Sequence, residues 1–184
     1  MPEAHRRKKD PNAVCSQIME NAARLAMEQG LSALTIETVA TAAGVTKGGL
    51  LHHFPNKQAL KEAVFEYFLV EFDAALQARM EADERTHGRF TRAYLELAFD
   101  TETKNEACEA LWISSLTDPD LRKTWARWFK AKLDQYGETE DGLHLEVVRF
   151  AADGIWSGSV VGVHPRDRDS LRQFLIDIAD RRFD

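Results

Sequence analysis

Apolar side chains recur every three or four residues along almost the whole of this 184-residue chain, in segments separated by glycine, proline and short polar stretches. This spacing places them on one face of an α-helix, whereas a half-buried strand needs strict alternation. The valines between Ile155 and Val163 have some strand character, but helical periodicity leads directly into them. The sequence therefore predicts an all-α fold of about nine helices.

Capping residues and breakers set the expected ends of these helices. The expected helices run from Pro11 to just before Gly30, over 36–42, from 47 to about 52, from 56 to about 80, between Gly88 and Asp100, over 105–116, from Pro119 to Gly137, from 143 to about 161, and over 167–179. The acidic segment 137–142 is expected to be a loop. The long helix that begins near residue 57 is expected to join an N-terminal domain, 10–56, to a larger helical domain, 57–184.

Charge is divided unevenly along the chain. The formal net charge is −6, yet residues 1–62 contain eight Lys or Arg and six Asp or Glu, which leaves −8 on residues 63–184. Such an asymmetry permits the N-terminal part to approach DNA phosphates while the acidic remainder stays away from them.

Other function classes lack their sequence signals. The longest uncharged stretch, 154–165, is too short to span a bilayer, and the basic residues near the start are followed by Asp10-Pro11-Asn12 instead of an apolar signal segment. We therefore expect a cytoplasmic protein without membrane contact. The six histidines are scattered and the two cysteines lie far apart, so no catalytic site, metal or cofactor is predicted.

Residues 36–55 have the spacing of a helix-turn-helix. Ala40 provides a small residue where two short helices would cross, and Gly44 stands where the turn needs a positive φ. A small core can form from Val39, Val45, Leu50 and Phe54. On spacing alone an ordinary helical hairpin remains an alternative.

The stretch from Ile18 to Leu60 resembles the DNA-binding domain of the TetR family of repressors. The resemblance is carried by Gly30, Thr35-Ile36, Ala40, Ala43-Gly44-Val45-Thr46-Lys47-Gly48 and Phe54-Pro55-x-Lys57-x-x-Leu60. The family usually has Thr or Ser where Gly49 stands, and often has aromatic residues at Leu51 and His53.

The resemblance implies a ligand-responsive regulator. Such a protein binds a palindromic DNA operator as a homodimer, usually as a repressor, and a small-molecule effector that binds the C-terminal domain releases it. Here the effector is unidentified and is expected to be apolar or amphipathic. The alternative is a DNA-binding activator or architectural protein that uses the same motif without a ligand.

Candidate DNA contacts follow from helix ends and charge. Thr35 and Thr46 would cap helices whose N-termini suit phosphate, Lys57 would add a cation, and Lys47 would reach base edges. The full predicted set is Thr35, Thr46, Lys47, Gly48, Gly49, His52, His53 and Lys57. For the two histidines, packing or exposure to water is an even alternative. The arm Arg6 to Lys9 is either a minor-groove contact or a solvated tail.

The C-terminal domain offers candidates for an effector site and a dimer interface. Effector candidates are Phe68, Phe72, Tyr94, Trp112, Trp125, Trp128 and Asp153, with further aromatic residues such as Trp156 on the same helices. A hydrophobic core is the competing interpretation of these aromatic residues. The predicted dimer interface joins a face of the eighth helix that lacks large side chains to an apolar face of the ninth helix. The first face is formed by Gly154, Gly158 and Gly162, and the second by Leu171, Phe174, Leu175 and Ile178. Packing of that seam within one chain is the alternative.

Overall fold

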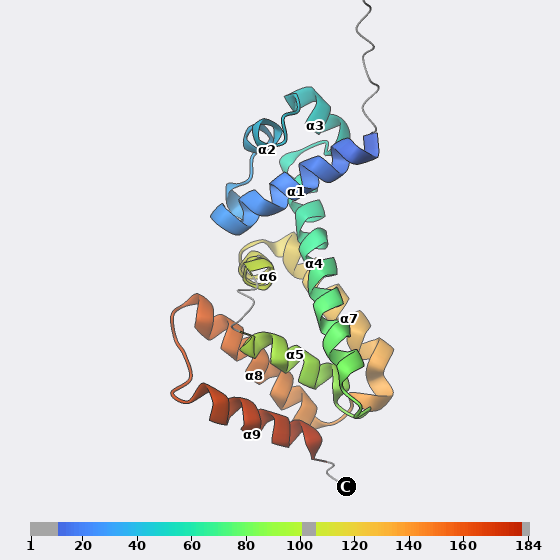
Figure 1. The fold of residues 1–184 in the computed structure, drawn as a ribbon, viewed down its shortest axis with the longest axis vertical. Helices are drawn as coiled ribbons and strands as arrows, with labels where there is room; N and C mark the ends of the chain where they lie inside the picture. Colours follow the sequence, from blue (N-terminus) through green and yellow to red (C-terminus); the bar gives the residue numbers. More distant parts are fainter. Residues whose placement is uncertain (1–10, 101–105, 182–184) are drawn as a thin grey trace, which may run out of the picture. The chain divides into compact units, whose positions relative to one another are not determined.

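The computed structural model describes residues 11–100 and 106–181, and within these ranges it is entirely helical. The helices are α1 (Pro11–Gln29), η1 (Leu31–Ala33), α2 (Ile36–Ala42), α3 (Lys47–His53), α4 (Lys57–Ala82), α5 (Arg89–Phe99), α6 (Glu106–Thr117), α7 (Pro119–Tyr136), η2 (Gly137–Thr139), α8 (Leu143–Val160) and α9 (Arg168–Asp180) (Figure 1). The predicted all-α fold is confirmed. No helix in the described ranges is both long enough and apolar enough to cross a membrane.

The chain divides into two compact units, Met1–Tyr67 and Phe68–Asp184, and the division falls inside α4. In the first unit α1 packs against α2 and η1, and α2 packs against α3. Ile18, Val39 and Leu50 are fully buried between these helices. These three helices stabilise one another because each contributes apolar residues to the same small core.

The turn between α2 and α3 has the geometry that the sequence predicts. Gly44 adopts φ +61°, a left-handed conformation that a residue with a Cβ takes at a steric cost. The amide of Val45 donates to the carbonyl of Ala40 at 3.0 Å, which closes the turn. Ala40 is 5% exposed, so a small side chain does lie where the helices meet.

In the second unit α5 lies beside α8 and α9, and α6 packs against α7 and α8 (Figure 1). Tyr94 and Phe90 of α5 are fully buried, as are Leu145 and Val148 of α8. α5 is thus the central helix of this unit, and nine of its residues are buried.

The C-terminus of α8 corrects the expectation of a continuous glycine seam. α8 ends at Val160, and Gly162 lies beyond it at φ +75°. The amides of Gly162 and Val163 donate to Ser159 and Gly158 at 3.1 and 2.8 Å, the two hydrogen bonds of a Schellman cap. A Cβ on Gly158 would lie 2.6 Å from the carbonyl oxygen of Val163. Local capping within the chain therefore accounts for two of the three glycines.

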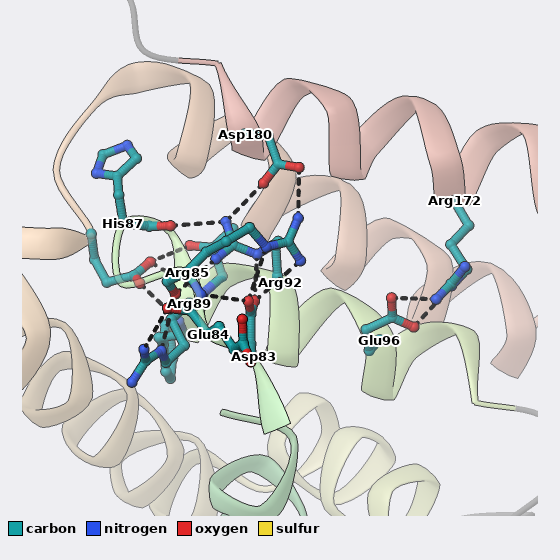
Figure 2. A network of polar contacts seen from close by, with 12 residues as sticks. Asp83, Glu84, Arg85, His87, Arg89, Arg92, Glu96, Arg172 and Asp180 are labelled. Carbon is teal, nitrogen blue, oxygen red and sulfur yellow. Dashed lines mark hydrogen bonds and ion pairs between the residues drawn. The ribbon is translucent and has the colours of Figure 1, made fainter. Parts of the chain in front are cut away.

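A network of ion pairs ties the loop after α4 to the end of α9. Arg92, which is 3% exposed, donates to Asp83 at 2.6 Å and to Asp180 at 3.0 Å, and Arg85 also reaches Asp180 at 2.7 Å. Figure 2 shows Arg92 between the two carboxylates, and the separate Arg172–Glu96 pair joining α9 to α5. Burial alone raises the pKa of Asp83, but hydrogen bonds from Arg85 and Arg92 lower it to about 2.

The segment 137–142, expected to be a loop, contains the 3-10 turn η2 and a buried acid. Glu140 is 4% exposed and accepts hydrogen bonds from the amides of Phe90 and Thr91 at 2.8 and 3.1 Å. These are amides in the first turn of α5, so Glu140 caps that helix from a distant part of the chain. Its carboxylate also pairs with Arg149 of α8 at 3.6 Å.

Candidate functional site

The two helices of the motif have free N-termini capped by threonine side chains. Thr46 Oγ1 accepts a hydrogen bond from the amide of Gly49 at 3.0 Å, and Thr35 Oγ1 accepts one from Thr38 at 3.0 Å. Thr38 Oγ1 in turn accepts from the Thr35 amide, which completes a capping box. Both predicted caps are present, and each leaves the positive end of a helix dipole suited to an anion.

An ion pair shows that the first turns of α2 and α3 lie next to each other. Lys47 Nζ is 2.5 Å from Glu37 Oε1, with both side chains more than half exposed. The hydrogen bond from Lys47 lowers the pKa of the Glu37 carboxyl. The ammonium group predicted to reach base edges is therefore paired with a carboxylate in the free protein, and binding a base would exchange one partner for another.

Two glycines form the exposed start of α3. A Cβ on Gly48 would meet nothing within 4 Å, and one on Gly49 would lie 3.2 Å from Thr46 Oγ1. Glycine inside a helix costs about 1 kcal/mol relative to alanine. The chain itself therefore gives no steric reason for a glycine at position 48.

The remaining predicted contacts lie in different surroundings. His52 is exposed, whereas His53 is half-buried, with its ring centroid 6.4 Å from that of Phe54. Lys57 is exposed, and its ammonium group donates a hydrogen bond to the carbonyl of Ser32 at 2.9 Å. This bond links the start of α4 to η1. The arm Arg6 to Lys9 lies outside the described residues.

An aromatic cluster occupies the second unit. Phe72 of α4 has four ring neighbours at 5.4 to 6.2 Å, namely Tyr94, Trp125, Trp128 and Trp156, and Phe129 stands 5.3 Å from Tyr94. We call these six residues the aromatic cluster. Four of the predicted effector residues belong to it, Phe68 is buried one turn before Phe72, and the Trp112 side chain lies outside the described part. Phe129 was missed as a candidate, although its position next to Trp128 on the predicted helix indicated it.

Asp153 joins the aromatic cluster through its carboxylate. Its Oδ1 accepts a hydrogen bond from the hydroxyl of Tyr94 at 2.6 Å. Burial raises the pKa of the Asp153 carboxyl, and the hydrogen bond from Tyr94 partly opposes that rise. The structure therefore brings the predicted acid and the predicted aromatic residues together.

A groove of about 1050 Å³ lies elsewhere in the same unit, between the start of α8 and the end of α9. His87 and His144 face each other there, with their Nε2 atoms 3.4 Å apart. Burial, followed by the nearby His87 and Arg149, lowers the pKa of His144. Across the described ranges no group of three or more potential ligands is arranged to hold a metal ion.

The predicted dimer residues separate into buried and exposed positions. On α9, Leu175 is 4% exposed and belongs to the core of its own unit, whereas Phe174 is 56% exposed. On α8, Gly154 is exposed, and a Cβ there would meet nothing within 4 Å.

Exposed apolar residues that the glycine pattern missed precede Gly154 along α8. Leu143, Val147 and Phe150 are 74%, 49% and 67% exposed. Their spacing from Gly154 places all four on one side of α8, and Leu143 and Val147 line the same groove as Phe174. We call these five residues, Gly154 and Phe174 included, the α8–α9 apolar face. The i, i+4, i+7, i+11 spacing was the sequence signal for it.

Comparison with known families covers both units. Residues 18–64 match the family model described as bacterial regulatory proteins, tetR family. Residues 88–180 match the model of a tetracyclin repressor-like C-terminal domain.

Individual proteins agree with this comparison. The chain is 26% identical over 178 residues to the HTH-type transcriptional regulator BetI of Ectopseudomonas mendocina, covering 90% of this chain and 91% of that one. BetI of Proteus mirabilis is 27% identical over 163 residues, with 81% of each chain covered.

Solved structures share the fold. The multidrug binding protein EbrR, in complex with imidazole, superposes with a TM-score of 0.71 at 23% identity, covering 97% of this chain and 96% of that one. A TetR family member of Streptomyces coelicolor, SCO1917, gives a TM-score of 0.67 at 22% identity, covering 90% and 97%. At these identities the likeness concerns the fold alone.

Proposed function

This chain belongs to the TetR family of transcriptional regulators, and we propose that it is a ligand-responsive repressor that binds a palindromic operator as a homodimer. The observation that carries the proposal is the start of α3, where a capped N-terminus, Lys47 and Gly48 share one exposed surface. A helix presented in this way fits a major groove, with phosphates at the helix ends.

The contacts divide by role. Lys57 and the N-terminal amides of α2 and α3 would hold phosphates, which fixes the register of the protein on the duplex. Lys47 would exchange Glu37 for a base edge, and Gly48 would let the backbone approach closely. His52, exposed one turn later on the same helix, is the better placed of the two histidines to add a contact.

The α8–α9 apolar face supports the dimer. Exposed apolar residues in a contiguous patch are typical of interaction sites, and a two-fold axis would bring the same face of two protomers together. Two protomers would then present two copies of α3 to half-sites about 34 Å apart, or a multiple of that distance.

The aromatic cluster supports the effector site. Apolar pockets with few polar groups are the usual form of small-molecule sites. EbrR, which shares the fold, is a multidrug binding protein with structures that hold ethidium, malachite green or proflavin. A ligand that separates the aromatic rings of this chain would move helices of the second unit, and differential affinity for the two states would weaken operator binding.

Two lysine variants test DNA recognition. Lys57→Ala should weaken binding to every sequence, and the slope of log affinity against log salt concentration should become shallower by about 0.9 for each phosphate that is no longer neutralised, as measured by fluorescence anisotropy. Lys47→Ala should chiefly reduce the preference for operator over random DNA. Lys123→Ala, which removes an exposed charge from the second unit, is the matched control and should change neither property. Equal weakening on operator and random DNA for both test variants would refute this division of roles.

A further inference from the structure

Glu37 is an isolated acid in the helix-turn-helix. Between Glu28 and Glu62 it is the only Asp or Glu in the sequence, although the whole chain of 184 residues contains 30. It lies in the first turn of α2, and its contact with Lys47 places it on the same exposed surface as the start of α3. A carboxylate on a surface that meets DNA repels the phosphates of the duplex. This single acid therefore bears on which DNA contacts the surface can make.

The ion pair between Glu37 and Lys47 contributes little to folding. Nζ of Lys47 lies 2.5 Å from Oε1 of Glu37, but both side chains are more than half exposed. Water screens the attraction in such a pair, and two long side chains lose rotamer freedom when they form it. The packing of α2 against α3 depends instead on the buried side chains of Val39 and Leu50. The main consequence of the pair is its effect on the other acceptors that Lys47 can bind.

A lysine on a DNA-binding surface has two kinds of acceptor available. Phosphate oxygens are anionic and occur in every sequence, so binding them raises affinity without specificity. Guanine O6 and N7 are neutral acceptors that are present only at particular positions. A carboxylate beside the ammonium group repels the anionic acceptor but not the neutral one. Glu37 therefore changes the relative strength of the two contacts.

We infer that Glu37 is a specificity-determining residue, which keeps Lys47 from binding phosphate on random DNA and leaves it able to bind a guanine edge in the operator. The inference rests on the proposed DNA contact of α3. A phosphate bound by Lys47 would lie beside the carboxylate of Glu37, whereas a base edge carries no net charge for that carboxylate to repel. Glu37 thus weakens binding to all DNA, but it weakens binding to random DNA more than binding to the operator.

The size of this effect follows from the contacts of one lysine. An exposed ion pair is worth up to about fivefold in an equilibrium constant, and a specific base contact is worth about five- to hundredfold. Lys47 can therefore leave Glu37 for guanine with a net gain in affinity. A phosphate contact that the carboxylate opposes gives little gain. Removing the charge of Glu37 should consequently strengthen binding to random DNA by several-fold and binding to the operator by less.

Glu37→Gln tests the inference, because it removes the charge and nearly keeps the size of the side chain. Fluorescence anisotropy at several salt concentrations measures binding of the full-length protein to a random duplex and to an operator duplex selected by the wild-type protein. We expect affinity for random DNA to rise about three- to tenfold, its slope against log salt concentration to steepen by about 0.9, and the preference for operator to fall at least about threefold. Glu28→Gln is the matched control, because Glu28 forms an exposed pair with Arg24 on α1, and it should leave that preference unchanged.

Lys47→Ala shows whether Glu37 acts through Lys47. In the Lys47→Ala background, Glu37→Gln should strengthen binding to operator and random DNA by similar factors, so the preference should not change. The inference would be overturned if Glu37→Gln left the preference of the otherwise wild-type protein unchanged. It would also be overturned if Glu37→Gln lowered the preference equally in both backgrounds, because Glu37 would then contact a base itself. If Lys47→Ala alone left the preference unchanged, the proposed role of Lys47 would be wrong and the inference would fail with it.

Discussion

Replacing Glu140 by alanine should destabilise the second unit more than any other single change of an acidic residue there. In the folded protein its carboxylate accepts two amides of α5 and the hydroxyl of Thr91, the last at 2.6 Å, and it pairs with Arg149. Loss of an N-terminal cap costs about 1 kcal/mol, and removal of one partner of a buried ion pair costs about 3–5 kcal/mol. Since the same oxygens make both interactions, the two costs overlap, and we expect about 3–5 kcal/mol in total.

The buried arginine makes the larger part of this effect. Burial lowers the pKa of Arg149, because its charge loses water inside the unit, and Glu140 is the first of the charges that oppose this shift. Glu140→Gln keeps an oxygen for one of the two α5 amides but also removes the charge that faces Arg149, so it should cost somewhat less than alanine, about 2–4 kcal/mol. Adding Arg149→Met to Glu140→Gln removes both charges and should recover part of the stability.

Urea denaturation followed by tryptophan fluorescence measures this effect, because all four tryptophans, at 112, 125, 128 and 156, belong to the second unit. Variants are compared at equal protomer concentration, because the proposed dimerisation would add to the apparent stability. Glu138→Ala, an exposed acid in η2, is the matched control. If Glu140→Ala were no less stable than Glu138→Ala, the reasoning from the cap and the buried pair would be wrong.

Three further outcomes are expected. The pKa of Asp83 is about 2, so its ionised carboxylate should stabilise the folded second unit by roughly 2 kcal/mol above pH 5, and this contribution should disappear as the pH falls from 4 to 2. Asp83→Asn should remove that pH dependence of the unfolding free energy in urea titrations. An unchanged pH profile would contradict the assignment. Phe150→Glu should give a folded monomer in sedimentation velocity, because this side chain is exposed in a single protomer and would be buried in the proposed dimer. A variant that stays dimeric would place the interface elsewhere. Thr46→Ala should lower the stability of the first unit by about 1 kcal/mol and weaken DNA binding, and unaltered melting by circular dichroism would show that the cap is dispensable.

The approximate extents of the α-helices and the position of the motif could be predicted from the sequence alone, apart from the C-terminal end of α8. Thr35 and Thr46 cap helices in the structure, and Gly44 takes the positive φ that the turn requires. These features are local, because a cap or a turn is decided by hydrogen bonds among residues three or four apart. The residues that decide them are adjacent in the sequence and can be interpreted without knowing how the helices pack.

The roles of the glycines on and after α8 could not be predicted from local sequence alone. Gly154, Gly158 and Gly162 have the same spacing, yet α8 ends before Gly162, and the chain folds back so that Val163 crowds Gly158. Only the path of the chain after α8 shows that Gly158 and Gly162 belong to the C-terminal cap of the helix, whereas Gly154 lies on its exposed face. The spacing of Leu143, Val147 and Phe150 places them on one face of α8, but only the tertiary structure shows that this face is exposed.

Long-range partners were decided by the tertiary structure. Glu140 caps a helix that begins some fifty positions earlier in the sequence, Arg92 joins Asp83 to Asp180, and Lys47 pairs with Glu37 instead of standing free. A charged side chain has many candidate partners in a chain of which 29% is charged, and its choice depends on which helix ends meet after the cores have formed. Periodicity fixes which face of a helix is buried, but the groups that it meets are fixed by packing between helices far apart in the sequence.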